Sequence, residues 1–107
     1  MNLEPLTTQA GRAEALLKAI ANRYRLMVLC ELHQGELSVS ALQQRIGLSQ
    51  SALSQHLAKL RAEEIVTTRR DAQTIYYALA SAEISRIIAT LHDIYCSDTC
   101  PPERTRP

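Results

Sequence analysis

Three cysteines and three histidines are the residues of this 107-residue chain whose side chains could bind a metal ion or undergo redox chemistry. His92, Cys96 and Cys100 follow one another at four-residue intervals, which would place them on one face of a helix, and His33 follows Cys30 by three residues. Thiolates and imidazoles are the ligands that zinc prefers, so one interpretation is a zinc or other thiophilic metal site. The others are reactive thiols or buried small hydrophobic residues.

The sequence contains none of the usual patterns of an enzyme active site. There is no glycine-rich phosphate loop, no nucleophile elbow and no paired acidic cluster. Cys96 and Cys100 are one residue too far apart for the Cys-x-x-Cys motif of thiol oxidoreductases. We therefore expect a protein that is not an enzyme, and we predict no cofactor and no resident metal.

A second group of polar side chains has the composition of a DNA-binding surface. The formal net charge is only +1, so attraction to phosphate must depend on where the cations lie. Ser, Gln, His, Lys and Arg side chains hydrogen-bond to base edges or phosphates. The alternative is a solvated helix face and loop, and for His56 packing at the helix edge. The predicted contacts are Ser38, Ser49, Gln50, Ser51, Ser54, Gln55, His56, Lys59, Arg61, Arg69, Arg70 and Gln73.

The elements that must position these residues follow from periodicity and capping. Apolar residues in 13–20 recur at helical spacing, and Asn22 is suited to cap a second helix that Gly35 ends. Ser38 is suited to cap a short third helix, which Gly47 ends by adopting the left-handed conformation. Ser49 is then suited to cap a fourth helix, whose leucines face inward. This gives two helices joined by a tight glycine turn.

The pattern changes after the fourth helix. β-Forming residues in 65–68 and 74–77 predict a hairpin with a loop over 69–73. Ser81 is suited to cap a last helix with a long apolar stripe, and Pro101 is expected to end it. That stripe, together with the lack of Phe and Trp, favours burial against a second copy of the chain.

Length and composition fit one domain over residues 1–99 followed by a flexible tail over 100–107. No apolar stretch is long enough to span a bilayer, so we predict a cytoplasmic protein without membrane contact. The order of elements predicts a mainly α fold with a small β-hairpin, α-α-α-α-β-β-α. A glycine-separated helix pair followed by a hairpin is typical of a winged helix-turn-helix, whose second helix enters the major groove. We therefore predict a homodimer that binds double-stranded operator DNA and regulates transcription.

The stretch from residue 26 to residue 79 resembles the ArsR/SmtB family of small effector-responsive regulators. The resemblance implies that Ser54-Gln55-His56-Leu57 belongs to the recognition helix and that the first and last helices form the dimer. It is carried by Glu36-Leu37-Ser38-Val39-Ser40, Gly47-Leu48-Ser49-Gln50-Ser51, Ser54-Gln55-His56-Leu57 and the Tyr76-Tyr77 strand.

The same resemblance bears on what the protein senses. Metal-sensing members have a Cys-x-Cys pair where this chain has Ser38-Val39-Ser40, and their last-helix site needs a second His ten residues from the first. Serine is a poor substitute for a thiolate, and Ser81 lies eleven residues before His92, so neither metal site is supported.

The remaining cysteines are similar in arrangement to those of the persulfide- and redox-responsive branch of the family. That resemblance implies that Cys30 and Cys96 are a sensing dithiol, joined by a sulfur bridge when reactive sulfur species or oxidants rise. The bridge is expected to weaken DNA binding. The alternatives are a zinc- or other metal-responsive repressor and a regulator that acts by displacing a silencing protein.

Overall fold

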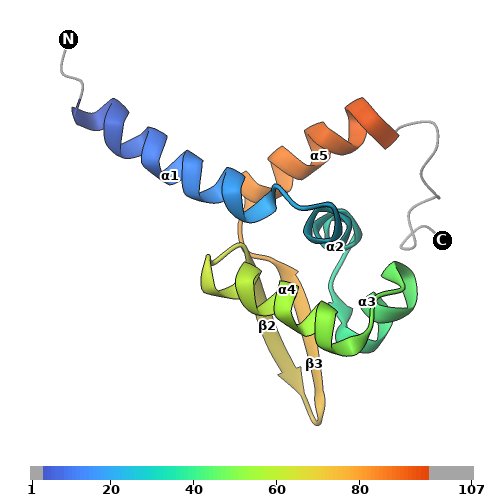
Figure 1. The fold of residues 1–107 in the computed structure, drawn as a ribbon. Coiled ribbons are helices and arrows are strands. Elements are labelled where there is room, and N and C mark those ends of the chain that lie inside the picture. Colours follow the sequence, from blue (N-terminus) through green and yellow to red (C-terminus); the bar gives the residue numbers. More distant parts are fainter. Residues whose placement is uncertain (1–3, 97–107) are drawn as a thin grey trace.

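The computed structural model describes residues 4–96, so Cys100 and the predicted tail 100–107 lie outside the described residues. Within that range the chain forms five helices and a three-stranded antiparallel sheet (Figure 1). The helices are α1 (Glu4–Ile20), α2 (Arg23–His33), α3 (Val39–Ile46), α4 (Gln50–Ala62) and α5 (Ala82–Cys96). The strands are β1 (Leu37–Ser38), β2 (Val66–Asp71) and β3 (Thr74–Leu79). The predicted mainly α winged helix-turn-helix fold is confirmed.

The predicted helix starts are made by side-chain caps. Asn22 accepts hydrogen bonds from the backbone N–H groups of Tyr24 and Arg25 at 3.0 and 3.1 Å. Serine hydroxyls cap the later helices in the same way: Ser38 accepts from Ala41 N, Ser49 from Ala52 N, and Ser81 from Ile84 N. Each cap satisfies a backbone donor that has no partner inside its helix. The four predicted caps are therefore confirmed.

Glycines end two of the helices as expected. Gly47 has φ of +83°, and its N–H donates to the carbonyl of Gln43 at 2.9 Å. Gly35 lies just beyond the C-terminus of α2, with φ of +143°. Both backbone conformations favour glycine, because an L side chain rarely adopts them. The turn after Gly47 directs the chain into α4 within a few residues.

The hairpin differs from the prediction in its extent. β2 continues through Asp71 and β3 begins at Thr74, so the loop predicted over residues 69–73 is wrong and only Ala72 and Gln73 form the turn. Cross-strand contacts extend the ladder, with Arg69 opposite Tyr76 and Arg70 opposite Ile75. A third strand, β1, also pairs with β3 and was not predicted, because two residues carry no detectable periodicity.

The core lies where α2 meets the other helices and the sheet. Val28 and Leu29 of α2 are fully buried, as are Leu53 and Leu60 of α4. The other buried apolar residues come from every helix and from the start of β2: Ala19, Ile20, Leu32, Leu42, Leu57, Ile65, Val66, Ile84 and Ile88. Helix α2 is therefore the central element of the core.

The most exposed large apolar side chains lie on two helices. Leu6 and Leu17 of α1 are 60% and 58% exposed, and Ile94 and Tyr95 of α5 are 64% and 75% exposed. Figure 1 shows α1 projecting away from the body, so its outer part has little of the chain to pack against. Exposed apolar side chains on these two helices fit an interface with another molecule. Within residues 4–96, no helix is long and apolar enough to cross a membrane.

Candidate DNA interface and cysteine pair

Helix α4 has one buried face and one polar face. Leu53, Leu57 and Leu60 are at most 2% exposed and fix the helix to the core. Ser51, Ser54, Gln55 and Lys59 come from the other positions of the same helix and are exposed. Because i, i+3 and i+4 residues share a face, these polar side chains form one surface beside the helix N-terminus. A recognition helix presents a polar surface of this kind to a major groove.

Ten of the twelve predicted DNA contacts have exposed side chains, and Ser38 and His56 are half-buried. Ser38 lies in β1, and its hydroxyl caps α3. The His56 ring packs against Tyr24 of α2, with 6.1 Å between the ring centroids and 31° between the ring planes. Helix-edge packing of His56 was one of the two interpretations of this residue. The contact joins the polar surface of α4 to α2.

Arg69 is held along the hairpin by neighbouring side chains. Its Nε donates to Glu36 Oε2 at 3.2 Å, and its Nη2 donates to Glu36 Oε1. The guanidinium carbon also lies 4.7 Å from the centre of the Tyr76 ring. The hydrogen bond from Arg69 is the main reason why the pKa of Glu36 is lowered and that of Arg69 is raised. Arg70 is also exposed, and it forms no ion pair with another residue of the range 4–96.

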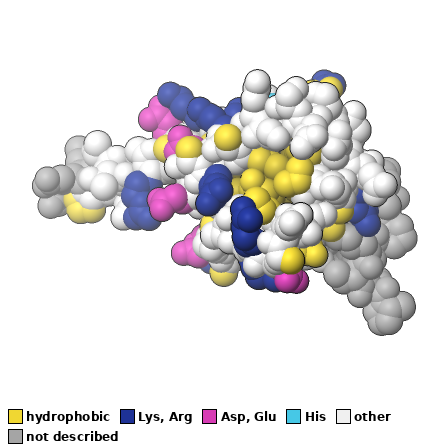
Figure 2. Space-filling view, turned by 90° about the horizontal axis from the view of Figure 1, so that it is seen from below, with side chains coloured by type: hydrophobic (Ala, Val, Ile, Leu, Met, Phe, Trp, Pro, Cys, Tyr) yellow, Lys and Arg dark blue, Asp and Glu magenta, His cyan; other side chains and the backbone are white. Residues whose placement is uncertain are grey.

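The face that carries the hairpin tip has mixed charge. Figure 2 views the molecule from that end, and Lys and Arg side chains appear at several separate places with Asp and Glu among them. This agrees with the formal net charge of +1 for the whole chain. This face therefore has no broad positive field, and any attraction of DNA to it would depend on particular side chains.

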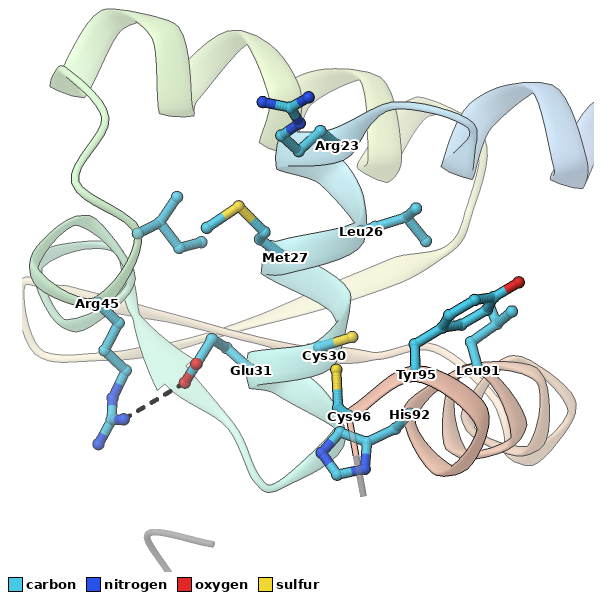
Figure 3. A pocket seen from close by; sticks show the side chains of 11 residues that line it. Arg23, Leu26, Met27, Cys30, Glu31, Arg45, Leu91, His92, Tyr95 and Cys96 are labelled. Atoms are coloured by element: carbon cyan, nitrogen blue, oxygen red, sulfur yellow. Dashed lines mark ion pairs between the residues drawn. The ribbon is translucent and has the colours of Figure 1, made fainter. Parts of the chain in front are cut away.

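A cavity of 490 Å³ lies between α2, α3 and α5, and both described cysteines line it. In Figure 3 the Cys30 and Cys96 side chains come from α2 and α5, and the Cys96 sulfur points toward Cys30. Both thiols are free and half-buried. The remaining lining residues are Arg23, Leu26, Met27, Glu31, Arg45, Ile46, Leu91, His92 and Tyr95. The structure thus brings together two residues separated by most of the chain.

The surroundings of Cys30 favour its protonated form. Burial raises the pKa of the Cys30 thiol, and the neighbouring Cys96 and Glu31 raise it further. A charge on Cys96 can affect Cys30 in this way only because the two groups are near each other. The thiolate is the nucleophile in sulfur chemistry, so Cys30 is suited to a second, resolving step.

Two histidines lie near the thiols. His33 Nδ1 is 3.3 Å from the Ser85 hydroxyl, and the centres of the His33 and His92 rings are 6.5 Å apart. His92 lines the cavity, and its Nε2 atom is buried without a hydrogen-bond partner among the described residues. Within residues 4–96, no group of three or more His, Cys, Asp or Glu side chains is arranged to hold a metal ion. The predicted alternative set that includes Cys100 extends outside the described residues.

The chain was compared with known proteins. The model for the bacterial regulatory protein, arsR family, matches residues 22–68. The transcriptional activator HlyU of Vibrio cholerae is 51% identical over 90% of this chain and 89% of its own length. The biofilm growth-associated repressor of Xylella fastidiosa is 39% identical over 91% of this chain and 85% of its own length.

Solved structures agree with the sequence comparison. Reduced HlyU from Vibrio cholerae has a TM-score of 0.84 at 50% identity, covering 88% of this chain and 99% of that one. A homodimeric winged helix-turn-helix domain from Mycobacterium bovis has a TM-score of 0.76 at 27% identity, covering 85% and 84% of the two chains. The exposed polar face of α4, the hairpin and these relatives lead to one conclusion: the chain belongs to the ArsR family of DNA-binding transcriptional regulators.

Proposed function

We propose that this protein acts as a homodimer that binds operator DNA and releases it when a sulfur bridge joins Cys30 to Cys96. The observation that carries the proposal is that the two thiols line one cavity from α2 and α5, with the Cys96 sulfur pointing toward Cys30 (Figure 3). The similarity to HlyU, which has been solved in a form described as reduced, supports thiol chemistry at this site.

The DNA-binding half of the proposal rests on α4 and the hairpin. Gln50, Ser54 and Gln55 are exposed at the N-terminal part of α4, where the side chains of a recognition helix meet base edges. Arg70 and Gln73, near the end of the hairpin, are positioned to contact the adjacent backbone. Two copies related by twofold symmetry would present two α4 helices to successive major grooves, about 34–36 Å apart.

The sulfur chemistry proceeds in two displacements. The Cys96 thiolate attacks the outer sulfur of a persulfide RSSH, and the donor's S–S bond breaks as RSH is released. The Cys30 thiolate then attacks the Cys96 sulfur and displaces hydrosulfide. Two thiols and one RSSH thereby give one Cys30–Cys96 disulfide, one RSH and one H₂S, with the persulfide as the oxidant. A polysulfide donor leaves additional sulfur atoms in the bridge.

The bridge is coupled to DNA through the dimer. Ile94 and Tyr95 are exposed beside Cys96 on α5, and such apolar side chains are suited to pack against the partner. The Cys30–Cys96 bridge links α5 to α2 and so shifts α5, the helix that builds the proposed interface. Because the half-site spacing is fixed by the duplex, a small change in the separation of the two α4 helices lowers operator affinity.

Two other modes of regulation remain as competing proposals. A metal-responsive repressor would use His33, His92 and the cysteines, but the described residues include no arranged group of three ligands. A regulator could also act by displacing a silencing protein from an overlapping site. Since similar proteins include one activator and one repressor, the direction of regulation does not follow from the family.

The test combines intact-mass spectrometry with a DNA-binding assay on palindromic promoter fragments. Polysulfide, peroxide and zinc are added separately to the reduced protein. We expect polysulfide to produce a Cys30–Cys96 bridge with added sulfur and to lower affinity by at least about tenfold, a ΔΔG of about 1.4 kcal/mol. Binding should also weaken steeply with salt, as phosphate contacts require.

Single cysteine variants provide the controls. Cys30→Ser and Cys96→Ser should each bind DNA but keep their affinity in polysulfide, whereas Cys100→Ser should respond like the original protein. Release of DNA by polysulfide from Cys30→Ser would contradict the proposed switch. Release by zinc alone would favour the metal-responsive alternative, and binding of no promoter fragment would favour a protein-interaction module.

A further inference from the structure

We infer that the cavity beside Cys30 and Cys96 selects organic persulfides that carry an apolar chain, with an anionic group at the far end. This inference rests on the proposed sulfur switch and specifies its effector. An inorganic persulfide contains only a few atoms and would occupy a small part of a 490 Å³ space. Cavities of about 300–1,000 Å³ are typical of sites that enclose an organic ligand.

The walls of the cavity are mostly apolar. Leu26 and Met27 contribute from α2, Ile46 from the end of α3, and Leu91 and Tyr95 from α5. In Figure 3 the Leu26 and Met27 side chains lie between the cysteines and Arg23. Methionine is flexible and polarizable, so it packs against apolar groups of different shapes. A donor that reaches the thiols through this space exchanges water for contact with these side chains, which favours an apolar chain.

The polar groups of the cavity lie at separate places around it. His92 lines the cavity on the α5 side, near the two thiols. Arg23 begins α2, two helical turns before Cys30 and about 10 Å away along the axis. The other arginine, Arg45, is paired with Glu31 at 3.4 Å. Arg23 has no ion-pair partner among the described residues, which leaves it available for an anionic group.

The spacing of these groups defines the ligand. Sulfur reacts at the Cys30–Cys96 end, an alkyl or aryl body covers Leu26 and Met27, and a carboxylate or similar anion meets Arg23. Because Arg23 is exposed, its contribution is smaller than that of the apolar wall. The first displacement is unchanged: Cys96 takes the outer sulfur, and the apolar thiol leaves as RSH.

The experiment compares three persulfide donors on the full-length protein: hexyl persulfide, an ω-carboxyalkyl persulfide of similar length, and the hydrophilic glutathione persulfide. Bridge formation is followed by quenched mass spectrometry, and each rate is divided by the rate of the same donor with a small free dithiol. This removes differences in intrinsic reactivity. Since each buried methylene is worth roughly a fourfold change in binding, we expect the normalised hexyl rate to exceed the glutathione rate by about tenfold or more.

Variants of the cavity sharpen the comparison. Met27→Gln should bring the hexyl preference close to one, while the volume-conserving Met27→Leu should retain it. The carboxylated donor should react a further few-fold faster than hexyl persulfide, and Arg23→Gln should remove only that increment.

Equal normalised rates for hexyl and glutathione persulfides would overturn the inference while leaving the bridge, and hence the proposed function, intact. A hexyl preference that survives Met27→Gln would overturn the assignment to this cavity. If no donor links the two cysteines, the proposed function fails and the inference fails with it.

Discussion

The polar face of α4 and the cavity between α2 and α5 depend on contacts of different range. α4 is capped by the residue just before it and held by its own leucines, and its exposed side chains follow directly from helical spacing. The cavity brings together Cys30 and Cys96, which are far apart in the sequence, and its walls come from three helices. The polar face of α4 is therefore set by local sequence and tolerates changes elsewhere, whereas the cavity depends on how distant helices pack.

The largest effect is expected where the polar face of α4 is removed. Replacing Gln50, Ser54 and Gln55 together by Ala should lower operator affinity by at least about a hundredfold, because each lost base contact costs roughly 1–3 kcal/mol. Fluorescence anisotropy with a labelled promoter fragment measures the change. All three side chains are exposed, so thermal unfolding and the rate of bridge formation should stay the same. Unchanged affinity would contradict the assignment of α4 as the recognition helix.

A smaller effect, on the free energy of unfolding, is expected at the Gly47 turn that precedes α4. Gly47→Ala should lower the free energy of unfolding by about 1–2 kcal/mol, because alanine is strained at φ of +83°. An added Cβ would meet no heavy atom within 4 Å, so backbone conformation alone should set the cost. Urea denaturation measures it.

The matched control is Gly11→Ala, which lies in helix α1 and is equally free of steric contacts. There the same substitution should stabilise the protein by up to about 1 kcal/mol, since alanine favours helix. Destabilisation of similar size at both positions would contradict the conformational explanation.

The cysteine cavity is tested through the acidity of Cys30. Because burial, Cys96 and Glu31 raise the pKa of this thiol, the pH midpoint for its alkylation should lie higher in the folded protein than in urea. Site-resolved mass spectrometry after iodoacetamide pulses measures that midpoint. Cys96→Ser and Glu31→Gln should each move it toward the value in urea, while Cys100→Ser serves as the control variant. A folded midpoint below the unfolded one would contradict the proposed order of attack.

The smallest effect is expected at the Glu36–Arg69 pair. Glu36→Gln leaves the Arg69 charge uncompensated, so affinity at low salt should rise a few-fold and the salt-dependence slope should steepen by about one. Glu14→Gln, which breaks the exposed Lys18–Glu14 pair of α1, is the control and should change neither quantity. An identical slope in both variants would place Arg69 away from the DNA backbone.

The same pair has a defined pH dependence. The folded pKa of Glu36 is lowered, so its contribution to stability is present above the ordinary Glu pKa and is lost as pH falls toward the folded value. Arg69 keeps its charge throughout this range.

The sequence predicted the elements whose determinants are local. Asn22, Ser38, Ser49 and Ser81 each cap a helix within three residues of themselves, and Gly47 adopts its left-handed conformation without help from distant residues. Such features can be predicted from the sequence because a side chain and its backbone partner are neighbours in the chain. The fold was predicted from the order of these local elements, and the family from the resemblance of residues 26–79.

Features that depend on distant partners were not predicted. β1 exists because Leu37 and Ser38 pair with β3, and two residues have no pattern of their own. Arg69 pairs with Glu36, which lies 33 positions earlier in the chain. Residue spacing does not reveal a pair at that distance, so Arg69 was expected in an open loop. The cysteine pair was inferred from resemblance, and neither the cavity nor its apolar walls left a signal in residue spacing.

Helix α2 occupies the centre of the molecule and contacts both the cysteine cavity and helix α4. Cys30 lies on one side of it, while Tyr24, nearly two turns earlier, rests against the His56 ring of α4. Between these points Val28 and Leu29 are completely buried, so this part of the helix is tightly packed. In the proposed switch, a shift of α2 at Cys30 therefore reaches α4 through side chains that are already packed, and it needs no hinge.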